Sequence, residues 1–277
     1  MASPDVRRCA VLGSPIEHSL SPVLHRAAYA ELGLRWQYSA VDVEEGELRR
    51  FVDGLDESWR GLSLTMPLKR TVLPLLDDLD EWAEVSGAAN TVVFNHGVRH
   101  GFNTDIPGAV AALRERVRGP FTEAVVLGGG ATATSMLIAL GLLGCERARL
   151  LVRDPARAAA TIAAVARSAT GPALTVEDLT TPVGSADLVV STIPAAAQTP
   201  ELVAAAEPCP VVFEVLYDPW PTPLAASALV SGRILVSGLD LLVNQAAVQV
   251  ELMTRQSPPI AAMRAAGEGA LAARTHR

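Results

Sequence analysis

The sequence predicts an α/β protein of two domains, the first a general α/β fold and the second of Rossmann type. Short runs rich in valine, leucine and isoleucine alternate with Ala- and Leu-rich helical patterns, as in folds built on parallel sheets. A glycine triplet follows one of these runs directly and opens a helical pattern, which is typical of a Rossmann turn. The length of 277 residues accommodates two ordinary domains.

The composition indicates a compact globular protein, which we expect in the cytoplasm. Hydrophobic residues make up 49% of the chain and the net charge is −7, which argues against binding to nucleic acid. The three cysteines lack CxxC spacing, so we expect neither a disulfide framework nor a metal site. The longest apolar run, residues 136–145, is too short to cross a membrane, and the apolar run near the N-terminus is too short for a signal peptide, so we expect neither. We expect a monomer or a homodimer.

The first domain should begin with a strand and then a helix. Ser21 is the expected N-cap of that helix, Pro22 lies in its first turn and Gly33 ends it. A hairpin is expected over residues 89–105, turning at the Asn-His-Gly of residues 95–97. The other expected elements are strands at 6–13, 36–43 and 59–67 and helices at 44–55 and 74–86.

The second domain is expected to cover residues 106–238. A helix at 107–118 leads to four strand-and-crossover units, whose strands lie in "EAVVL", "RARLLV", "ADLVVS" and "PVVFEV". After "RILVSGLDLLVNQ" the chain is helical to its end, and this tail can pack back on the first domain. The first domain would then be discontinuous and consist of residues 1–105 with 239–277.

The glycine triplet predicts a dinucleotide site. In "AVVLGGGATATSML" a buried strand runs into a turn and then a helix, and G-x-G-x-x-G/A matches Gly128, Gly130 and Ala133. Small residues there permit a tight turn and close approach of the backbone to a pyrophosphate, which the helix N-terminus then binds. The alternative is a turn that serves only the packing of an α/β domain.

The end of the next strand bears on the choice between NADP and NAD. Arg153 and Arg157 can pair with a 2′-phosphate and favour NADP, whereas Asp154 can accept hydrogen bonds from ribose hydroxyls and favours NAD. Two guanidinium groups against one carboxylate favour NADP. Asp154 can at the same time be a helix N-cap, with Pro155 at the first helical position.

Four polar motifs lie outside the glycine turn. In "GSPIEHSLSP", Ser19 and Ser21 can present two hydroxyls to a carboxylate, although ordinary helix-capping serines would have the same sequence. "LTMPLK" places the only lysine of the chain, Lys69, just after a strand that Pro67 ends. The remaining motifs are "GAANT", with Asn90, and "GFNTDIPG", with Asn103, Thr104 and Asp105, where an aspartate is also a common cap.

In this order, the motifs resemble those of the shikimate dehydrogenase family over residues 10–255. The matching pieces are "GSPIEHSLSPVLH", "TMPLK", "GAANT", "NTDIPG", "YDPWPTPL" and "SGLDLLVNQAAVQVE". The resemblance implies NADP-dependent, reversible reduction of 3-dehydroshikimate to shikimate in chorismate and aromatic amino acid biosynthesis. It makes the first domain the substrate-binding and catalytic domain and the second the NADP-binding domain.

The resemblance also implies roles for individual residues. Lys69 and Asp105 match the catalytic pair of the family, and Gly238 matches a contact with the nicotinamide. The substrate contacts would be Ser19, Ser21, Thr65, Lys69, Asn90, Asp105, Tyr217 and Gln245. The cofactor contacts would be Gly128, Gly129, Gly130, Ala131, Thr132, Arg153, Asp154, Arg157, Val215 and Gly238.

The proposed chemistry explains why one lysine remains in a chain with 22 arginines. Hydride transfer to a ring ketone places negative charge on an oxygen that must be protonated by a group within hydrogen-bond reach. A lysine ammonium can release a proton, whereas an arginine stays charged in proteins. Asp105 would hold the Lys69 ammonium and accept a hydrogen bond from a substrate hydroxyl.

Some positions depart from the family pattern. Ala131 replaces a glycine of the nucleotide loop, Asp154 a small polar residue, Ser63 an asparagine and Leu241 a methionine, and "VSTIP" replaces Asn-Ala-Thr. The pair Ser-x-Ser, in place of Ser-x-Thr, favours shikimate over quinate. The alternatives are an NAD-preferring quinate/shikimate or aminoshikimate dehydrogenase and a non-catalytic nucleotide sensor, against which the intact Lys69 and Asp105 speak.

Overall fold

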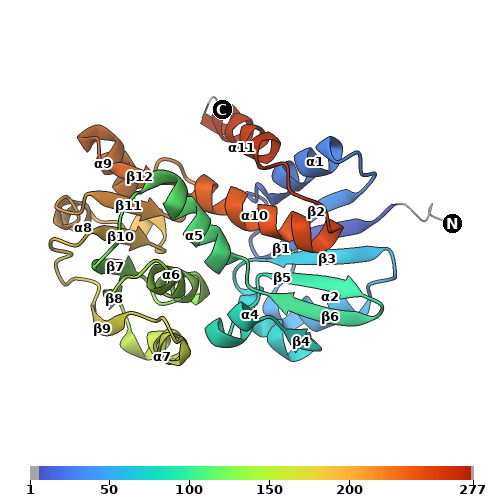
Figure 1. The fold of residues 1–277 in the computed structure, drawn as a ribbon, viewed down its shortest axis with the longest axis horizontal. Helices are drawn as coiled ribbons and strands as arrows, with labels where there is room; N and C mark the ends of the chain where they lie inside the picture. Colours follow the sequence, from blue (N-terminus) through green and yellow to red (C-terminus); the bar gives the residue numbers. More distant parts are fainter. Residues whose placement is uncertain (1–5, 276–277) are drawn as a thin grey trace. The chain divides into compact units, whose positions relative to one another are not determined.

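The computed structural model describes residues 6–275, except for the side chains of Arg157 and Thr275. The chain divides into two compact units, and the predicted α/β class is confirmed. Unit one runs to Thr104 and resumes at Leu242, whereas unit two consists of Asp105–Leu241. Each unit is built on its own sheet (Figure 1).

The described part of unit one contains a mixed sheet in the order β2-β1-β3-β5-β6-β4. Strand β1 pairs in parallel with β2 and β3, whereas β5 pairs antiparallel with β3 and β6. Residues 9–12 of β1 are buried, because β1 lies between β2 and β3 and side chains pack on both faces of the sheet there. The strands are β1 (Arg8–Gly13), β2 (Gln37–Asp42), β3 (Trp59–Leu64), β4 (Asp78–Leu79), β5 (Thr91–Asn95) and β6 (Val98–Phe102).

Helices of unit one come from both ends of the chain. Helix α1 packs against α11, as the blue and red helices of Figure 1 show. The Arg274 guanidinium donates to the carbonyl of His18 at 3.0 Å, so α11 also contacts the loop before α1. The helical elements are α1 (Ser21–Glu31), η1 (Glu45–Glu47), α2 (Leu48–Asp53), α3 (Leu68–Thr71), η2 (Leu73–Leu75), α4 (Glu81–Ser86) and α11 (Ile260–Thr275).

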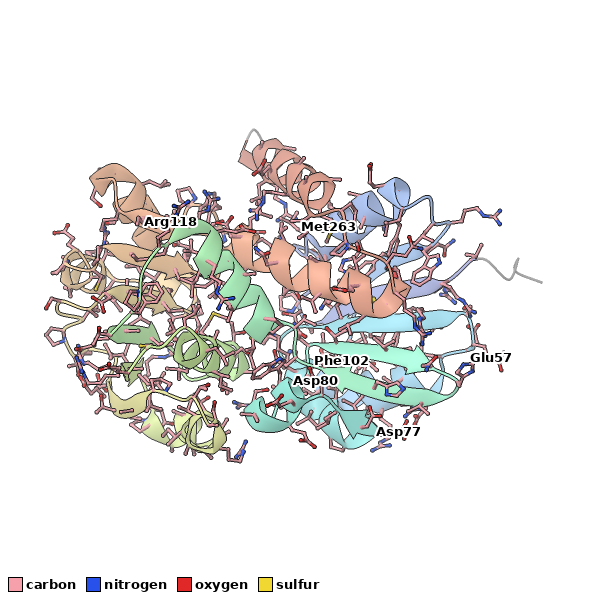
Figure 2. The ribbon with its side chains drawn as sticks, in the orientation of Figure 1. Glu57, Asp77, Asp80, Phe102, Arg118 and Met263 are labelled. Carbon is pink, nitrogen blue, oxygen red and sulfur yellow. The ribbon has the colours of Figure 1, made fainter. Side chains whose placement is uncertain are left out.

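The predicted helix at 74–86 is wrong. Strand β4 interrupts it, because Asp78 and Leu79 pair with β6, and α4 begins only after Asp80. Asp80, labelled in Figure 2, directly precedes α4. Its carboxylate accepts hydrogen bonds from the backbone N–H groups of Ala83, at 2.8 Å, and Asn103, at 3.1 Å. A cap and a tertiary strand pairing therefore outweigh the acidic helical pattern.

Two further details of unit one were predicted from single residues. The N-cap of α1 is Leu20 rather than Ser21, which is the first helical residue, so that prediction is wrong. The hairpin turn is present: His96 and Gly97 have φ angles of 50° and 81°, and positive values at both central positions suit a two-residue hairpin.

Unit two is a Rossmann-type unit. Its described residues form a parallel sheet in the order β12-β11-β10-β7-β8-β9. Its strands are β7 (Glu123–Leu127), β8 (Arg147–Val152), β9 (Ala173–Asp178), β10 (Leu188–Ser191), β11 (Val211–Glu214) and β12 (Ile234–Val236). Its helical elements are α5 (Asp105–Arg116), α6 (Ala131–Leu142), η3 (Pro155–Ala158), α7 (Ala159–Arg167), η4 (Ala195–Ala197), α8 (Pro200–Ala205) and α9 (Pro223–Ser231).

Helix α10 (Gly238–Thr254) begins in unit two and ends in unit one. Strand β9 was not predicted, because its half-buried edge position gives it a weak apolar pattern. Among residues 6–275, no helix has the length and apolar character needed to cross a membrane.

Candidate active site

The serine loop of unit one is packed against the segment that follows β3. The backbone N–H of Ser14 donates to the carbonyl of Met66 at 3.1 Å. A Cβ atom on Gly13 would lie 2.9 Å from the same carbonyl oxygen, so only glycine permits this approach. Ser19 lies in the loop, and its hydroxyl accepts a hydrogen bond from the backbone N–H of Ser21 at 3.3 Å.

A buried histidine supports the first turn of α1. The His25 ring stacks on Tyr38 with 3.9 Å between ring centroids, and its Nδ1 donates to the carbonyl of Ser21 at 2.9 Å. Among the described residues, His25 Nε2 has no hydrogen-bond partner. Burial lowers the pKa of His25 from 6.5 to about 4, and the hydrogen bond to Ser21 opposes this shift only in part.

Lys69 lies in α3, a single helical turn that begins directly after Pro67. The backbone N–H of Thr65 continues the pairing with β1, bonding to the carbonyl of Leu12 at 2.9 Å. The carbonyl of Lys69 then accepts a hydrogen bond from the N–H of Ala89 at 2.8 Å. The backbone of Lys69 is therefore held next to Asn90, and its side chain is half-buried.

Asn90 and Gln245 meet at the centre of a buried polar network. Asn90 Oδ1 accepts hydrogen bonds from the backbone N–H of Thr104 at 2.8 Å and from the Thr91 hydroxyl at 2.9 Å. Asn90 Nδ2 donates to Gln245 Oε1 at 3.3 Å. Both amides are almost fully buried, so these bonds fix their orientation.

The network continues through residues that the sequence did not identify as part of the site. Gln249 Nε2 donates to the Thr91 hydroxyl at 2.9 Å, and Gln249 Oε1 accepts from the Ser63 hydroxyl at 2.8 Å. The Tyr38 hydroxyl donates to Ser63 at 2.6 Å. Gln249 lies one turn beyond Gln245 on α10, and that i, i+4 spacing was the available signal.

Six of the predicted substrate residues belong to unit one, where hydrogen bonds join Asn90 to Gln245 and Ala89, next to Asn90, to the carbonyl of Lys69. They lie just beyond the carboxyl ends of β1 and β3, at the start of β5, or on the first turns of α10 within this unit. In parallel sheets, this edge is where ligands bind. They are Ser19, Ser21, Thr65, Lys69, Asn90 and Gln245.

Asp105 and Tyr217 belong to unit two. Asp105 is the first residue of α5 and is buried, and Tyr217 follows β11 and is partly exposed. The pairing of Lys69 with Asp105 joins residues of different units and stays a prediction.

The glycine turn of unit two has the predicted close packing. Gly128 has a φ of +98°, and a Cβ atom there would lie 2.5 Å from the Thr192 hydroxyl oxygen. A Cβ on Gly129 would lie 3.1 Å from Ala158 and from Val152. A side chain at Gly128 would therefore be strained and crowded, as a Rossmann turn requires.

The third glycine differs from the other two. Gly130 is the N-cap of α6, and a Cβ atom there would meet nothing within 4 Å. Ala131 and Thr132 form the first turn of α6, whose N-terminal amides make a site for an anion. Gly130 faces open space, so the backbone there can be approached by a phosphate group.

The end of β8 carries the residues expected at the adenine ribose. Arg153 is exposed, and the side chain of Arg157 lies outside the described residues. The Asp154 carboxylate accepts a hydrogen bond from the backbone N–H of Ala156 at 2.9 Å and is the N-cap of η3. Asp154 is therefore a helix cap, as the sequence predicted, and its contact with the ribose stays a prediction.

Gly238 is enclosed by the segment that follows β11. A Cβ atom on Gly238 would lie 2.5 Å from the carbonyl oxygen of Val215 and from the carbonyl carbon of Leu216. Both residues predicted to contact the cofactor here, Val215 and Gly238, are thus in direct contact. No larger residue fits at position 238 without movement of the backbone.

A capping box fixes the start of α10. The Asp240 carboxylate accepts hydrogen bonds from the N–H, at 2.9 Å, and the hydroxyl, at 2.8 Å, of Ser237, whose oxygen accepts from the N–H of Asp240. Arg116 adds an ion pair at 2.9 Å. Burial raises the pKa of Asp240, but the bonds from Ser237 and Arg116 outweigh it, so the pKa lies below its ordinary value. The sequence "SGLD" was the available signal for this box.

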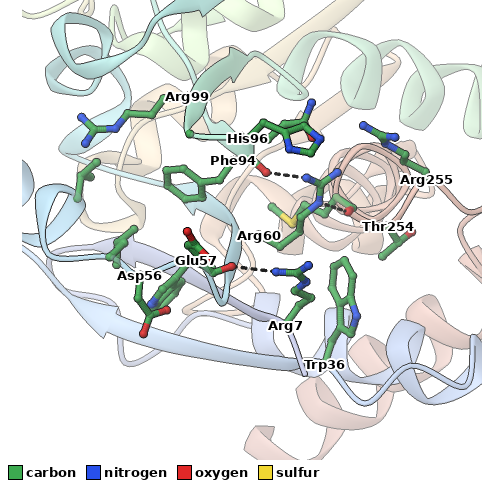
Figure 3. A pocket seen from close by; sticks show the side chains of 16 residues that line it. Arg7, Trp36, Asp56, Glu57, Arg60, Phe94, His96, Arg99, Thr254 and Arg255 are labelled. Atoms are coloured by element: carbon green, nitrogen blue, oxygen red, sulfur yellow. Dashed lines mark hydrogen bonds between the residues drawn. The ribbon is translucent and has the colours of Figure 1, made fainter. Parts of the chain in front are cut away.

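A cavity of about 790 Å³ in unit one lies elsewhere (Figure 3). It is lined at the start of β1 and β3 and at the hairpin turn by residues such as Arg7, Arg60 and His96, with Arg255 after α10. Thr65 and Lys69, of the predicted substrate residues, follow the opposite end of β3. No cluster of His, Cys, Asp or Glu side chains suited to a metal ion occurs within residues 6–275.

Comparisons with known proteins identify the family. A family model described as the shikimate dehydrogenase substrate binding domain matches residues 11–92, and one described as the shikimate 5′-dehydrogenase C-terminal domain matches residues 238–266. Shikimate dehydrogenase (NADP(+)) of Moorella thermoacetica is 36% identical over 92% of this chain and 90% of its own length.

Solved structures agree with these matches. The structure of Mycobacterium tuberculosis shikimate dehydrogenase has a TM-score of 0.87 and 36% identity, covering 95% of this chain and 99% of that chain. The Thermus thermophilus enzyme, solved in complex with NADP(H) and shikimate, has a TM-score of 0.83 and 30% identity, with coverage of 95% and 99%. This chain therefore belongs to the shikimate dehydrogenase family.

Proposed function

We propose that this protein is an NADP-dependent shikimate dehydrogenase that reversibly reduces 3-dehydroshikimate to shikimate in aromatic amino acid biosynthesis. The observation that carries the proposal is the Asn90–Gln245 network, which fixes two predicted substrate residues beside the backbone of Lys69. The curated relatives with this name cover nearly the whole chain.

The substrate is a ring with a carboxylate and several hydroxyl groups, and unit one offers suitable partners for both. The hydroxyls of Ser19 and Ser21 can donate to the carboxylate. The Thr65 hydroxyl, the Asn90 amide and the Gln245 amide can then bind ring hydroxyls, because each can donate or accept. The buried network orients both amides before the substrate arrives, which lowers the entropy cost of binding.

The Lys69 ammonium is the proposed proton donor to the ketone oxygen, and it takes the proton back in the reverse direction. Asp105 would hold the ammonium and accept a hydrogen bond from the substrate hydroxyl. An arginine in place of Lys69 could stabilise the oxyanion but would not release a proton.

The residues of unit two fit NADP. The cofactor, when bound, supplies the hydride. Gly128, Gly130 and the first turn of α6 would hold the pyrophosphate, and Arg153 with Arg157 would pair with the 2′-phosphate. The Asp154 carboxylate is already bonded to the N–H of Ala156, which weakens the argument for NAD that its presence alone would support.

Initial rates measured with shikimate, quinate and aminoshikimate, each with NADP and with NAD, test the proposal. We expect shikimate with NADP to give the highest kcat/KM. Oxidation of none of the three would refute the dehydrogenase function, and preference for quinate with NAD would refute the specificity. We also propose that the protein is cytoplasmic and is a monomer or a homodimer. Size-exclusion chromatography with light scattering would distinguish the monomer from the homodimer.

A further inference from the structure

Glu214, the last residue of β11, is a buried acid that the proposed mechanism does not use. Its side chain is fully excluded from solvent. Within the described part of the chain, its hydrogen-bond partners are neutral groups and include no lysine, arginine or histidine. Burying a carboxylate without a neighbouring cation costs free energy, so the hydrogen bonds that it accepts must offset this cost.

The partners of Glu214 are all donors. Oε1 accepts from the backbone N–H of Leu216 at 3.0 Å. Oε2 accepts from the Thr222 hydroxyl and from Gln198 Nε2, both at 2.7 Å, and Ser191 adds a further side-chain hydrogen bond. Burial raises the pKa of Glu214 above its ordinary value, while these hydrogen bonds act in the opposite direction.

This set of donors matches a carboxylate and no other side chain of the same size. A glutamine at this position would turn its NH₂ group toward the N–H of Leu216 or toward the donors on Oε2, leaving donors face to face. Gln198 cannot rotate to compensate, because its Oε1 accepts from the backbone N–H of Leu224 at 2.9 Å.

One carboxylate therefore ties both ends of the segment 215–222. Leu216 is at the beginning of the segment, where the chain leaves the sheet after Val215 bonds to the carbonyl of Ser191 at 3.1 Å. Thr222 is at its end, where its oxygen also accepts from the N–H of Ala225 at 3.3 Å and caps α9. Tyr217, predicted to contact the substrate, lies between these two ties, and Val215, predicted to contact the cofactor, lies between Glu214 and the first tie at Leu216.

The same ties reach both predicted cofactor regions of unit two. The carbonyl groups of Val215 and Leu216 enclose Gly238, so the path of this segment decides how closely the start of α10 is approached. Ser191 directly precedes Thr192, whose hydroxyl lies against Gly128. Glu214 thus holds the segment at Gly238 directly, whereas its link to the glycine turn is indirect and runs through Ser191 and Thr192.

We propose that Glu214 is a positioning residue, whose carboxylate holds segment 215–222 so that Val215 meets the nicotinamide half of the cofactor and Tyr217 meets the substrate. This inference rests on the proposed function. Glu214 would then position only the residues that contact the nicotinamide half of the cofactor. The residues at the adenine half, such as Arg153, are positioned by other elements of unit two.

The test is Glu214→Gln in the full-length protein, with dissociation constants for NADP and for 2′,5′-ADP, which carries only the adenine half. We expect the affinity for 2′,5′-ADP to stay within about twofold while the affinity for NADP falls. The KM for shikimate should rise and kcat should fall, each by about tenfold or more. Glu207→Gln, a matched change at an exposed glutamate after α8, should leave all constants unchanged.

Two outcomes would overturn the proposal. One is unchanged kcat and KM, and the other is a loss of 2′,5′-ADP affinity equal to the other losses, which would indicate a general disruption of unit two. Should Glu214→Gln not fold, Thr222→Val and Thr222→Ser carry the same test, because only the first removes a hydroxyl donor. Thr222→Val should then keep its affinity for 2′,5′-ADP while its kcat falls and its KM for shikimate rises, and Thr222→Ser should keep all three values.

Failure of the proposed function gives a different result. Wild-type protein would then oxidise no shikimate at all, and the comparison of NADP with 2′,5′-ADP binding would still decide the role of Glu214. In that case a selective loss of NADP affinity in Glu214→Gln supports the positioning role, and equal losses of both ligands refute it.

Discussion

The side-chain amide of Asn90 donates to Oε1 of Gln245 at 3.3 Å, across 155 positions of the sequence. The orientation of Asn90 is determined, because its other terminal atom accepts from the backbone N–H of Thr104, and a backbone N–H can only donate. The bond joins the start of β5 to α10, so the site in unit one depends on two distant parts of the chain.

Replacing Gln249 should destabilise the buried network that supports Asn90 and Gln245. Gln249→Met keeps the volume but removes one of the buried hydrogen-bond partners of the Thr91 hydroxyl and one of those of the Ser63 hydroxyl, at a cost of about 1–3 kcal/mol in the free energy of unfolding. Urea unfolding measures the loss. Gln256→Met, a matched change at an exposed position, should cost nothing measurable, and an equal loss in both variants would contradict the argument.

Two single substitutions in α3, one at Lys69 and one at Arg70, test the proton transfer. Lys69→Arg keeps the positive charge but removes the proton donor, so we expect kcat to fall by about 100-fold or more, with a smaller change in the KM for shikimate. Arg70→Lys is the control and should retain most activity. A Lys69→Arg variant with near-wild-type kcat would exclude Lys69 as the proton donor.

The two outer glycines of the turn should respond differently to alanine. Gly128→Ala places a Cβ against Thr192 at a φ of +98°, and we expect a loss of about 1–3 kcal/mol in stability. Gly130→Ala has open space around its Cβ, so its stability should be close to wild type while its affinity for NADP falls. Thermal unfolding and NADP titration separate the two effects, and similar unfolding temperatures would contradict the packing argument.

Asp154→Ser should increase the preference for NADP. Serine can still cap η3 through the N–H of Ala156, while the negative charge beside the expected 2′-phosphate is removed. The expected result is a rise of severalfold in the ratio of kcat/KM for NADP to that for NAD, with little change in stability. A ratio that stays constant would mean that Asp154 does not face the ribose.

His25 should make the protein sensitive to acid. Its folded-state pKa of about 4 lies below the ordinary 6.5, so the unfolded chain binds the proton more readily at intermediate pH. The stability contributed by neutral His25 is fully present above pH 6.5 and is lost as the pH falls toward 4, by about 3 kcal/mol in total.

Unfolding free energies between about pH 7.5 and pH 4 measure this dependence. His25→Phe, which preserves stacking on Tyr38, should have a flatter profile. His96→Asn alters an exposed histidine in the left-handed region, where asparagine is tolerated, and should keep the wild-type slope. Equal slopes in all three proteins would remove His25 as the cause.

The Rossmann unit was predictable because buried parallel strands are short continuous apolar runs. Residues 124–127 of β7 and 188–190 of β10 are fully buried, and their sequences show no alternation. Strand β4 was not predictable, because two residues carry no periodic pattern and their pairing with β6 is a tertiary contact. The same applies to Leu20 in place of Ser21 at the start of α1, where the surrounding loop decides the cap.

Polar motifs at strand ends predicted part of the candidate site, and the resemblance to the family supplied the other proposed substrate residues, Tyr217 and Gln245. The residues behind them were missed. Gln249 is one polar residue in a long helix, and Glu214 is an acid after a buried strand, so neither has a local pattern that reveals its partners. Their roles depend on hydrogen bonds formed only after distant segments have packed.

The discontinuity of unit one has a consequence for synthesis on the ribosome. Unit two is complete once residue 241 has been made, whereas unit one lacks Gln245 and the α11 surface that covers α1 until the last helices emerge. The second unit in the sequence can therefore be the first to fold, against the usual N-to-C order. An interrupted translation product would contain the cofactor unit without a finished substrate site, and such a fragment could bind nucleotide but not turn it over.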